Sequence, residues 1–137
     1  MPDINQLRVG DALPERRHVP TNVSLFLYNA AIWNAHRIHY DAPYTTEVEK
    51  HPAIVVDGPL QGDWLTQVVL NWVGDAGELV EFEYSNRRAS YLGETLISGG
   101  RIEAIRPADS EIDVSLFVRT EAGDVTAPGR AVVRLRR

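Results

Sequence analysis

The chain has 137 residues, enough for one domain with a hydrophobic core but cramped for two. Its hydrophobic fraction of 44% and charged fraction of 24% are ordinary for a soluble protein, and no segment approaches the roughly 20 apolar residues that span a bilayer. The net charge of −5 argues against general binding to nucleic acid, which needs a basic face, and the absence of cysteine excludes disulfides and thiolate metal sites.

The N-terminal residues 1–20 have neither the basic start nor the apolar run of a secretory signal, so we expect a cytoplasmic protein without a membrane partner. A turn at Gly10 and Asp11 and the polar run from Glu15 to His18 indicate a loop that leads into a short first strand. We expect His18 at the surface, because its neighbours in the sequence are polar.

A helix is predicted to follow this strand. Its apolar residues recur at intervals of three and four, and they are Val23, Phe26, Leu27, Ala30 and Ala31. Thr21 or Asn22 can cap the first turn, because a side-chain oxygen there accepts a hydrogen bond from an unpaired backbone N–H. The pattern places the end of the helix near Trp33 or Asn34.

The segment 35–57 is predicted to be a long shaped loop with a short polar turn of helix at 45–49. Loops of this length inside a compact domain are often functional, and this one contains His39. We expect Arg37 and Tyr44 to fix the loop by packing and by hydrogen bonds.

Gly58 and Pro59 open the most apolar helix of the chain. Pro59 suits the first helical position, where its missing N–H costs nothing, and Gly74 or Gly77 can end the helix. The apolar residues cover more than one face, and they are Leu60, Trp64, Leu65, Val68, Val69, Trp72 and Val73. A helix that is apolar around most of its circumference is usually buried, so another element must wrap it.

The second half of the chain supplies the wrapping element, because its apolar residues alternate with polar ones at the period of half-buried strands. The predicted strands lie at 80–85, 95–105, 112–119 and 131–135. Turn signals separate them at 91–93, 106–109 and 121–124. These signals predict an antiparallel meander. We therefore expect an α+β protein in which a curled antiparallel sheet wraps around one long central apolar helix.

The most specific motif is the run W-N-A-H-R-I-H-Y-D from Trp33 to Asp41, followed by Gly58 in V-V-D-G-P-L. The motif resembles the MaoC-like (R)-specific enoyl-CoA hydratases and the hydroxyacyl-thioester dehydratases of type 2, most strongly in H-R-I-H-Y-D-x-P-Y. This resemblance implies a single MaoC-like hot-dog domain over residues 1–137. It also implies a lyase of fatty acid metabolism, a hydratase or dehydratase that interconverts 2-enoyl-CoA and 3-hydroxyacyl-CoA.

The resemblance assigns catalytic roles to three residues. His39 falls on the family's histidine, and imidazole can accept a proton from water near neutral pH. Gly58 falls on the glycine whose N–H holds the thioester oxygen, where an unpaired donor combines with the positive end of the helix dipole. Asn34 falls on the residue that is usually aspartate. Because an amide cannot take up a proton, His39 is expected to be the sole base and Asn34 to orient the water.

The substrate-binding residues expected around this group are Tyr40, Asp57, Pro59 and Arg87. Asp57 stands where many relatives have histidine, and two roles remain open: it favours the helix N-terminus electrostatically, or it acts as a second carboxylate near the substrate. Arg87 belongs to a basic patch that could meet the phosphates of coenzyme A, which enters as part of the substrate. No separate cofactor or metal is expected, because His36, His39 and Asp41 form only a loose metal-binding pattern.

Two other functions remain open. The amide at Asn34 also fits a non-catalytic hot-dog subunit that binds an acyl-CoA or acyl-carrier thioester and partners an active homologue. A hot-dog thioesterase is the third alternative. We expect a dimer, because a hot-dog monomer leaves a sheet edge and a flank of its central helix uncovered. The partner is either a second copy of the chain or another hot-dog protein, and as in the resembling family the ligand tunnel would lie at the interface.

Overall fold

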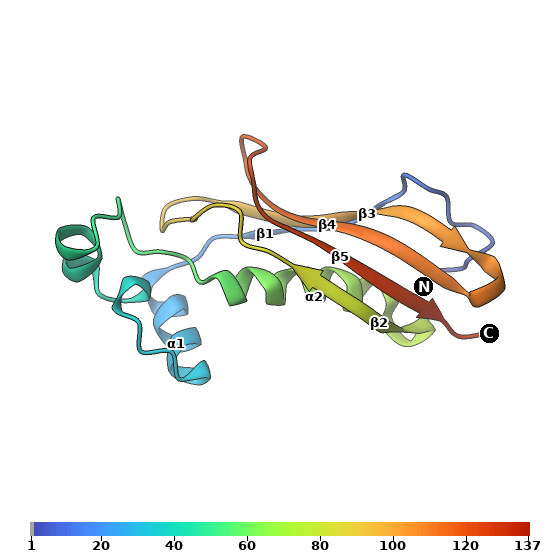
Figure 1. Ribbon diagram of the computed structural model, residues 1–137, viewed down its shortest axis with the longest axis horizontal. Coiled ribbons are helices and arrows are strands. Elements are labelled where there is room, and N and C mark those ends of the chain that lie inside the picture. The colour runs from blue at the N-terminus through green and yellow to red at the C-terminus, as the bar shows by residue number, and fades with distance from the viewer. Residues whose placement is uncertain (1) are drawn as a thin grey trace.

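One antiparallel sheet of five strands lies along helix α2 in the computed structural model, which describes residues 2–137 (Figure 1). The helices and helical turns are α1 (Asn22–Ile32), η1 (Arg37–His39), η2 (Tyr44–Val48), α2 (Gly58–Val73), η3 (Gly74–Ala76) and η4 (Pro107–Asp109). The strands are β1 (Ala12–His18), β2 (Gly77–Tyr84), β3 (Leu96–Arg106), β4 (Glu111–Thr120) and β5 (Val125–Leu135). This arrangement confirms the expected α+β hot-dog fold.

The strand order is β1-β3-β4-β5-β2, and every neighbouring pair is antiparallel. Strands β3, β4 and β5 form the expected meander, but β2 pairs with β5, with Glu78 opposite Arg134. The expectation that β2 joins the same meander is therefore wrong, because alternating apolar residues identify a strand without specifying its neighbour. Instead, residues 85–95 connect β2 to β3 (Figure 1). Within this connection, the main-chain oxygen of Ser90 accepts a hydrogen bond from the N–H of Val56, just before α2, at 2.8 Å.

The hydrophobic core lies between α2 and the sheet. Alternate residues of β4 are at most 3% exposed, and they are Ile112, Val114, Leu116 and Val118. Helix α2 contributes Leu65 and Val69, which have no exposed surface. Burying a side chain of this kind contributes roughly 1.5–3 kcal/mol. As predicted, Pro59 lies in the first turn of α2 and Gly74 follows its last residue, so the central helix is delimited as expected.

Helix α1 begins at the predicted cap. The Thr21 hydroxyl accepts from the N–H of Ser24, and the Ser24 side chain accepts from the N–H of Thr21. The buried residues of α1 are Leu25 and Asn29, whereas the apolar positions that predicted the helix, among them Phe26 at 57%, are exposed. The periodic apolar stripe therefore faces away from the core. No helix among residues 2–137 is both long and apolar enough to cross a bilayer.

His18, at the end of β1, is half-buried, whereas we expected it to be exposed at the surface. Its ring stacks on Trp64 of α2 with 4.0 Å between the ring centroids, and its Nε2 lies 2.8 Å from the hydroxyl of Ser98. Burial, and to a lesser extent the charge of Arg16, lowers the pKa of His18 to about 4. The polar neighbours of His18 in the sequence gave no sign of this position, because Trp64 reaches it only through the tertiary fold.

Candidate active site

His39 lies in η1, and only 8% of it is exposed. Its Nδ1 lies 2.8 Å from the main-chain oxygen of Val55. Because a carbonyl oxygen only accepts hydrogen bonds, Nδ1 carries a hydrogen, and Nε2 is the bare nitrogen of the neutral ring. Nε2 lies 3.5 Å from Oδ2 of Asp57. The contact with Val55 thus leaves Nε2 as the nitrogen that can accept a proton.

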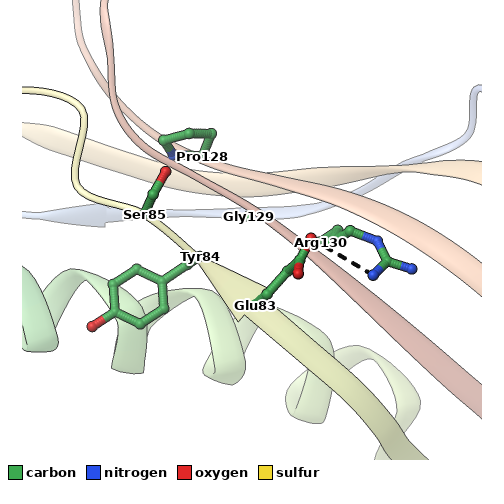
Figure 2. A pocket seen from close by; sticks show the side chains of 6 residues that line it. All are labelled: Glu83, Tyr84, Ser85, Pro128, Gly129 and Arg130. Carbon is green, nitrogen blue, oxygen red and sulfur yellow. Dashed lines mark ion pairs between the residues drawn. The ribbon is translucent and has the colours of Figure 1, made fainter.

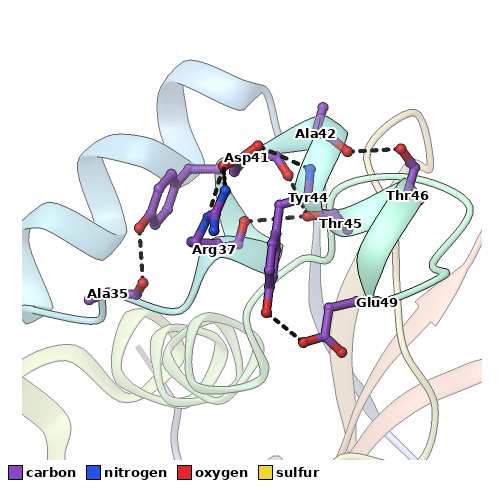
Figure 3. A network of polar contacts seen from close by, with 9 residues as sticks. Ala35, Arg37, Asp41, Ala42, Tyr44, Thr45, Thr46 and Glu49 are labelled. Atoms are coloured by element: carbon purple, nitrogen blue, oxygen red, sulfur yellow. Dashed lines mark hydrogen bonds and ion pairs between the residues drawn. The ribbon is translucent and has the colours of Figure 1, made fainter.

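A network of polar contacts fixes the loop that carries His39 (Figure 3). The Arg37 guanidinium donates from Nε and Nη2 to Asp41 Oδ2, at 3.0 and 2.8 Å, and lies 4.1 Å from the centre of the Tyr44 ring. The hydrogen bond from Arg37 holds the pKa of the Asp41 carboxyl below its ordinary value. The Tyr44 hydroxyl donates to Glu49 at 2.8 Å. These motif residues therefore shape the loop and hold η1 in place.

Asp57 immediately precedes α2, at the N-cap position, but its side chain makes no capping hydrogen bond. The residue has no exposed surface. Asn29 of α1 donates from Nδ2 to Asp57 Oδ1 at 3.0 Å, whereas Oδ2 has no hydrogen-bond partner among residues 2–137. Burial raises the pKa of the Asp57 carboxyl, while Asn29, His39 and Asn34 act in the opposite direction. The carboxyl group therefore lies inside the protein, beside the imidazole.

His39 and Gly58 line the same pocket, which has a volume of about 360 Å³. Its other lining residues are Val55, Val56, Gln61, Asn86, Arg87, Arg88 and Ala89. Gly58 begins α2, so its N–H has no acceptor within the helix and lies at the positive end of the helix dipole. Arg88 is engaged by Glu94 and Asp124, at 3.3 Å each, while Arg87 is an exposed part of the lining. The pocket therefore combines a basic nitrogen, a backbone donor and a cationic side chain.

Gln61 is a polar lining residue that we did not predict from the sequence. It lies one turn after Gly58 and is 2% exposed, and the buried hydroxyl of Thr126 donates to its Oε1 at 2.7 Å. This bond fixes the side-chain amide and leaves its NH₂ group as the part that can meet a ligand. A polar residue among the apolar residues of α2 was the signal that could have identified it.

The remaining predicted residues lie outside this pocket. Asn34 and Tyr40 line a neighbouring pocket of about 290 Å³, together with Asn29 and the exposed apolar end of α1. The Asn34 Oδ1 accepts from the N–H of His36 at 3.0 Å, and the Tyr40 hydroxyl donates to the main chain within its own loop. Pro59 is exposed in the first turn of α2. The structure thus brings His39, Gly58 and Arg87 together, and it places Asn34 in a different pocket.

A hollow of about 420 Å³ lies where the end of β2 meets β5 (Figure 2). Its charged residues, Glu83 and Arg130, pair with each other at 3.6 Å, and the Tyr84 ring extends toward α2 (Figure 2). It shares no lining residue with the pocket of His39.

Within residues 2–137, no three His, Cys, Asp or Glu side chains are placed to hold a metal ion together. The pocket of His39 is the candidate active site, because His39 and Gly58 both line it.

Comparison with known proteins adds a family match. The family model described as hydroxyacyl-thioester dehydratase type 2 matches residues 6–92, which include His39 and Gly58. The chain is 50% identical over 52 residues to mesaconyl-C(4)-CoA hydratase of Chloroflexus aurantiacus, covering 38% of this chain and 18% of that protein. It is 46% identical over 41 residues to the mitochondrial hydroxyacyl-thioester dehydratase type 2 of Schizosaccharomyces pombe, covering 30% of this chain and 14% of that protein. The matches thus span less than a fifth of either relative.

Solved structures share the fold at low sequence identity. The (R)-hydratase from A. caviae involved in PHA biosynthesis has a TM-score of 0.84 and 16% identity, over 96% of this chain and 98% of that one. A chain of the ChsH1–ChsH2 complex from Mycobacterium tuberculosis has a TM-score of 0.82 and 18% identity, over 94% of this chain and 98% of that one. At such identities the likeness establishes the hot-dog fold, and activity has to be argued from the site.

Proposed function

Because the chain belongs to the hydroxyacyl-thioester dehydratase type 2 family, we propose that it is a hydro-lyase that acts on an acyl thioester. It would add water across the C2–C3 double bond of a 2-enoyl-CoA to give a 3-hydroxyacyl-CoA, or catalyse the reverse reaction. One observation carries the proposal: the imidazole of His39 and the first amide of α2, at Gly58, line the same pocket.

The two groups suit the two ends of this reaction. In hydration, Nε2 of His39 accepts a proton from water as the water oxygen attacks C3. The electrons of the double bond move toward the thioester oxygen, where the N–H of Gly58 and the helix dipole stabilise the negative charge. Transfer of the proton to C2 completes the addition and returns the imidazole to its starting form. Dehydration uses the same groups in reverse order.

Other lining residues fit the rest of such a substrate. Arg87 offers a cationic group to the phosphates of coenzyme A, which enters as part of the substrate. The side-chain NH₂ group of Gln61 can donate to an oxygen of the acyl thioester. An acyl-carrier thioester would offer its phosphate to Arg87 in the same way.

We also propose that a second hot-dog chain covers the exposed apolar residues of α1 and the free edge of β2. Helix α1 exposes Phe26 at 57% and Trp33 at 93%, and β2 is an edge strand of the sheet. Apolar patches and unpaired edges of this kind favour association. The partner is a second copy of the chain or another hot-dog protein, and sedimentation of the purified chain, alone and with a candidate partner, distinguishes the two.

Crotonyl-CoA provides the direct test, because hydration removes the ultraviolet absorbance of its conjugated thioester. We expect turnover by the wild type and a loss of about 10²-fold or more in kcat for His39→Ala. His51→Ala is the matched control, since His51 lies outside the pocket and should leave turnover unchanged. Full activity of His39→Ala would show that this histidine is not the base.

A non-catalytic acyl-thioester-binding subunit is the second candidate, and it is favoured by the amide at Asn34, where the resembling family usually has aspartate. This candidate predicts binding without turnover, and a gain of activity when Asn34→Asp restores the acid. The hydro-lyase proposal instead predicts turnover by the wild type and lower activity of Asn34→Asp, because this variant adds a second carboxyl group beside Asp57. Turnover of crotonyl-CoA by the two proteins separates the candidates.

A further inference from the structure

Asp57 occupies a capping position without acting as a cap. An aspartate at the N-cap normally accepts a hydrogen bond from an amide of the first turn, which is worth about 1 kcal/mol. Here the side chain makes no such bond, although the residue has no exposed surface. Its Oδ1 accepts from Asn29, and its Oδ2 faces His39. A buried carboxyl group that forgoes its cap costs stability, so its orientation requires another explanation.

Asn29 fixes the orientation of this carboxyl group. The side chain is 2% exposed, and its Nδ2 donates to the oxygen of Leu25 at 2.8 Å and to Asp57 Oδ1 at 3.0 Å. Both hydrogens of the amide are therefore used by acceptors, which establishes that the nitrogen faces Asp57. With Oδ1 held by α1, Oδ2 is the oxygen left for His39.

We propose that Asp57 is the carboxylate partner of His39 and stabilises the imidazolium that forms when this histidine accepts a proton. Because Nδ1 donates its hydrogen to Val55, the incoming proton binds Nε2, which is 3.5 Å from Asp57 Oδ2. The protonated ring and the carboxylate attract each other at this distance, whereas the neutral ring lacks that attraction. Position 57 thereby supplies the carboxyl group that Asn34 lacks. Asp57 is closed to the pocket and acts through His39, so it is a positioning residue.

The inference rests on the proposed hydro-lyase function. The groups that face the carboxyl are Asn29 and Tyr28 of α1, Asn34 of the following loop, and His39. Of these, only the imidazole of His39 can become a cation by accepting a proton. In hydration the proton passes from water to Nε2 and then to C2, while a C3–O and a C2–H bond form. Asp57 keeps its own bonds throughout and lowers the energy of the charged intermediate state of His39.

Asp57→Asn tests the charge with little change in shape, because the new amide oxygen can still accept from Asn29. We expect kcat for crotonyl-CoA to fall by about 10²-fold or more, with little change in KM, because residue 57 does not reach the pocket. The matched control is Asp63→Asn, an exposed change on α2 that should alter neither constant. Adding Asn34→Asp to the Asp57→Asn variant returns a carboxyl group to the cluster and should recover part of the activity.

The stability of Asp57→Asn separates this role from a structural one. Burial raises the pKa of Asp57, so above its ordinary titration range the ionised carboxyl destabilises the folded state. We therefore expect the variant to unfold at the same or a higher denaturant concentration than the wild type at pH 7. A residue retained only for structure would give a less stable variant. A lower midpoint together with unchanged kcat per folded molecule would overturn the proposal.

A double-mutant cycle tests the pairing without any activity assay. Denaturant unfolding of Asp57→Asn, His39→Ala and the double variant should give free-energy changes that do not add, because the two groups interact directly. Additive changes would overturn the proposal, as would full kcat in Asp57→Asn. Non-additive changes in a protein that hydrates no enoyl-CoA would refute the proposed function and leave the pairing of Asp57 with His39 standing.

Discussion

Alanine substitutions at two glycines of α2 should have different effects, one on catalysis and one on stability, because the added methyl group would meet different neighbours at each position. At Gly58 a Cβ would contact the side-chain amide of Asn86, with its Cγ at 2.8 Å and its Oδ1 at 2.9 Å. At Gly62 it would lie 2.5 and 2.6 Å from ring carbons of Tyr84. Gly58 and Asn86 line the candidate active site, and Gly62 does not.

The expected magnitudes follow from these neighbours. Asn86 is exposed and can swing aside, so Gly58→Ala should change the free energy of unfolding by less than about 1 kcal/mol. Alanine keeps the backbone N–H, but its methyl group would block the approach of the thioester oxygen to this donor, and losing that contact costs up to about 2.7–4 kcal/mol, or 10²–10³-fold in kcat. The Tyr84 ring is half-buried and packs on Phe82, so Gly62→Ala should cost about 1–3 kcal/mol of stability by overpacking.

The assay combines crotonyl-CoA turnover with chemical denaturation for the two variants. We expect Gly58→Ala to be stable and almost inactive, and Gly62→Ala to be less stable with normal kcat per folded molecule. Near-normal kcat in Gly58→Ala would refute the role of this amide as the donor to the thioester oxygen. If both variants lost stability and activity together, residue 58 would be structural, and the choice of active site would fail.

Three further predictions concern the fold. Burial lowers the pKa of His18 to about 4, so between about pH 6.5 and about 4 the histidine is protonated in the unfolded chain but not in the folded one. Acidification through this range should therefore lower the free energy of unfolding. His18→Phe, which can still stack on Trp64, should reduce this pH dependence in denaturant titrations. Hydrogen bonds from Arg106 lower the pKa of Asp113, so Arg106→Gln should lower the free energy of unfolding at pH 7. The difference in free energy of unfolding between variant and wild type should disappear below about pH 4, where Asp113 becomes protonated. Leu65→Ala should cost about 2–5 kcal/mol in the same measurement, because this side chain is fully buried in the core.

Much of the fold could be predicted from local signals. Pro59 and Gly74 delimit α2 because their backbone preferences do not depend on distant contacts. The alternation in β4 marks a half-buried strand, since successive side chains of a strand point to opposite faces. The neighbour of β2 could not be predicted, because pairing with β5 depends on how residues 85–95 cross the molecule.

The candidate site could likewise be predicted only in part. The motif singled out His39 and Gly58, and the tertiary structure places both on one pocket. The motif does not include Gln61, whose only sequence signal is a polar residue in an apolar helix and whose amide is oriented by Thr126 of β5. It also left the role of Asp57 open, because a carboxyl group before a helix is usually a cap unless another element draws it away.

The sequence by itself determined the elements and the chemical groups available, because propensities, caps and motif residues are properties of short segments. Only the tertiary structure decided which of these groups meet. Asn29 and His39 come from separate segments, and packing of α1 and η1 against the start of α2 brings both to the carboxyl of Asp57. The physical reason is that burial and electrostatic coupling depend on distances through space, which neighbours along the chain do not determine.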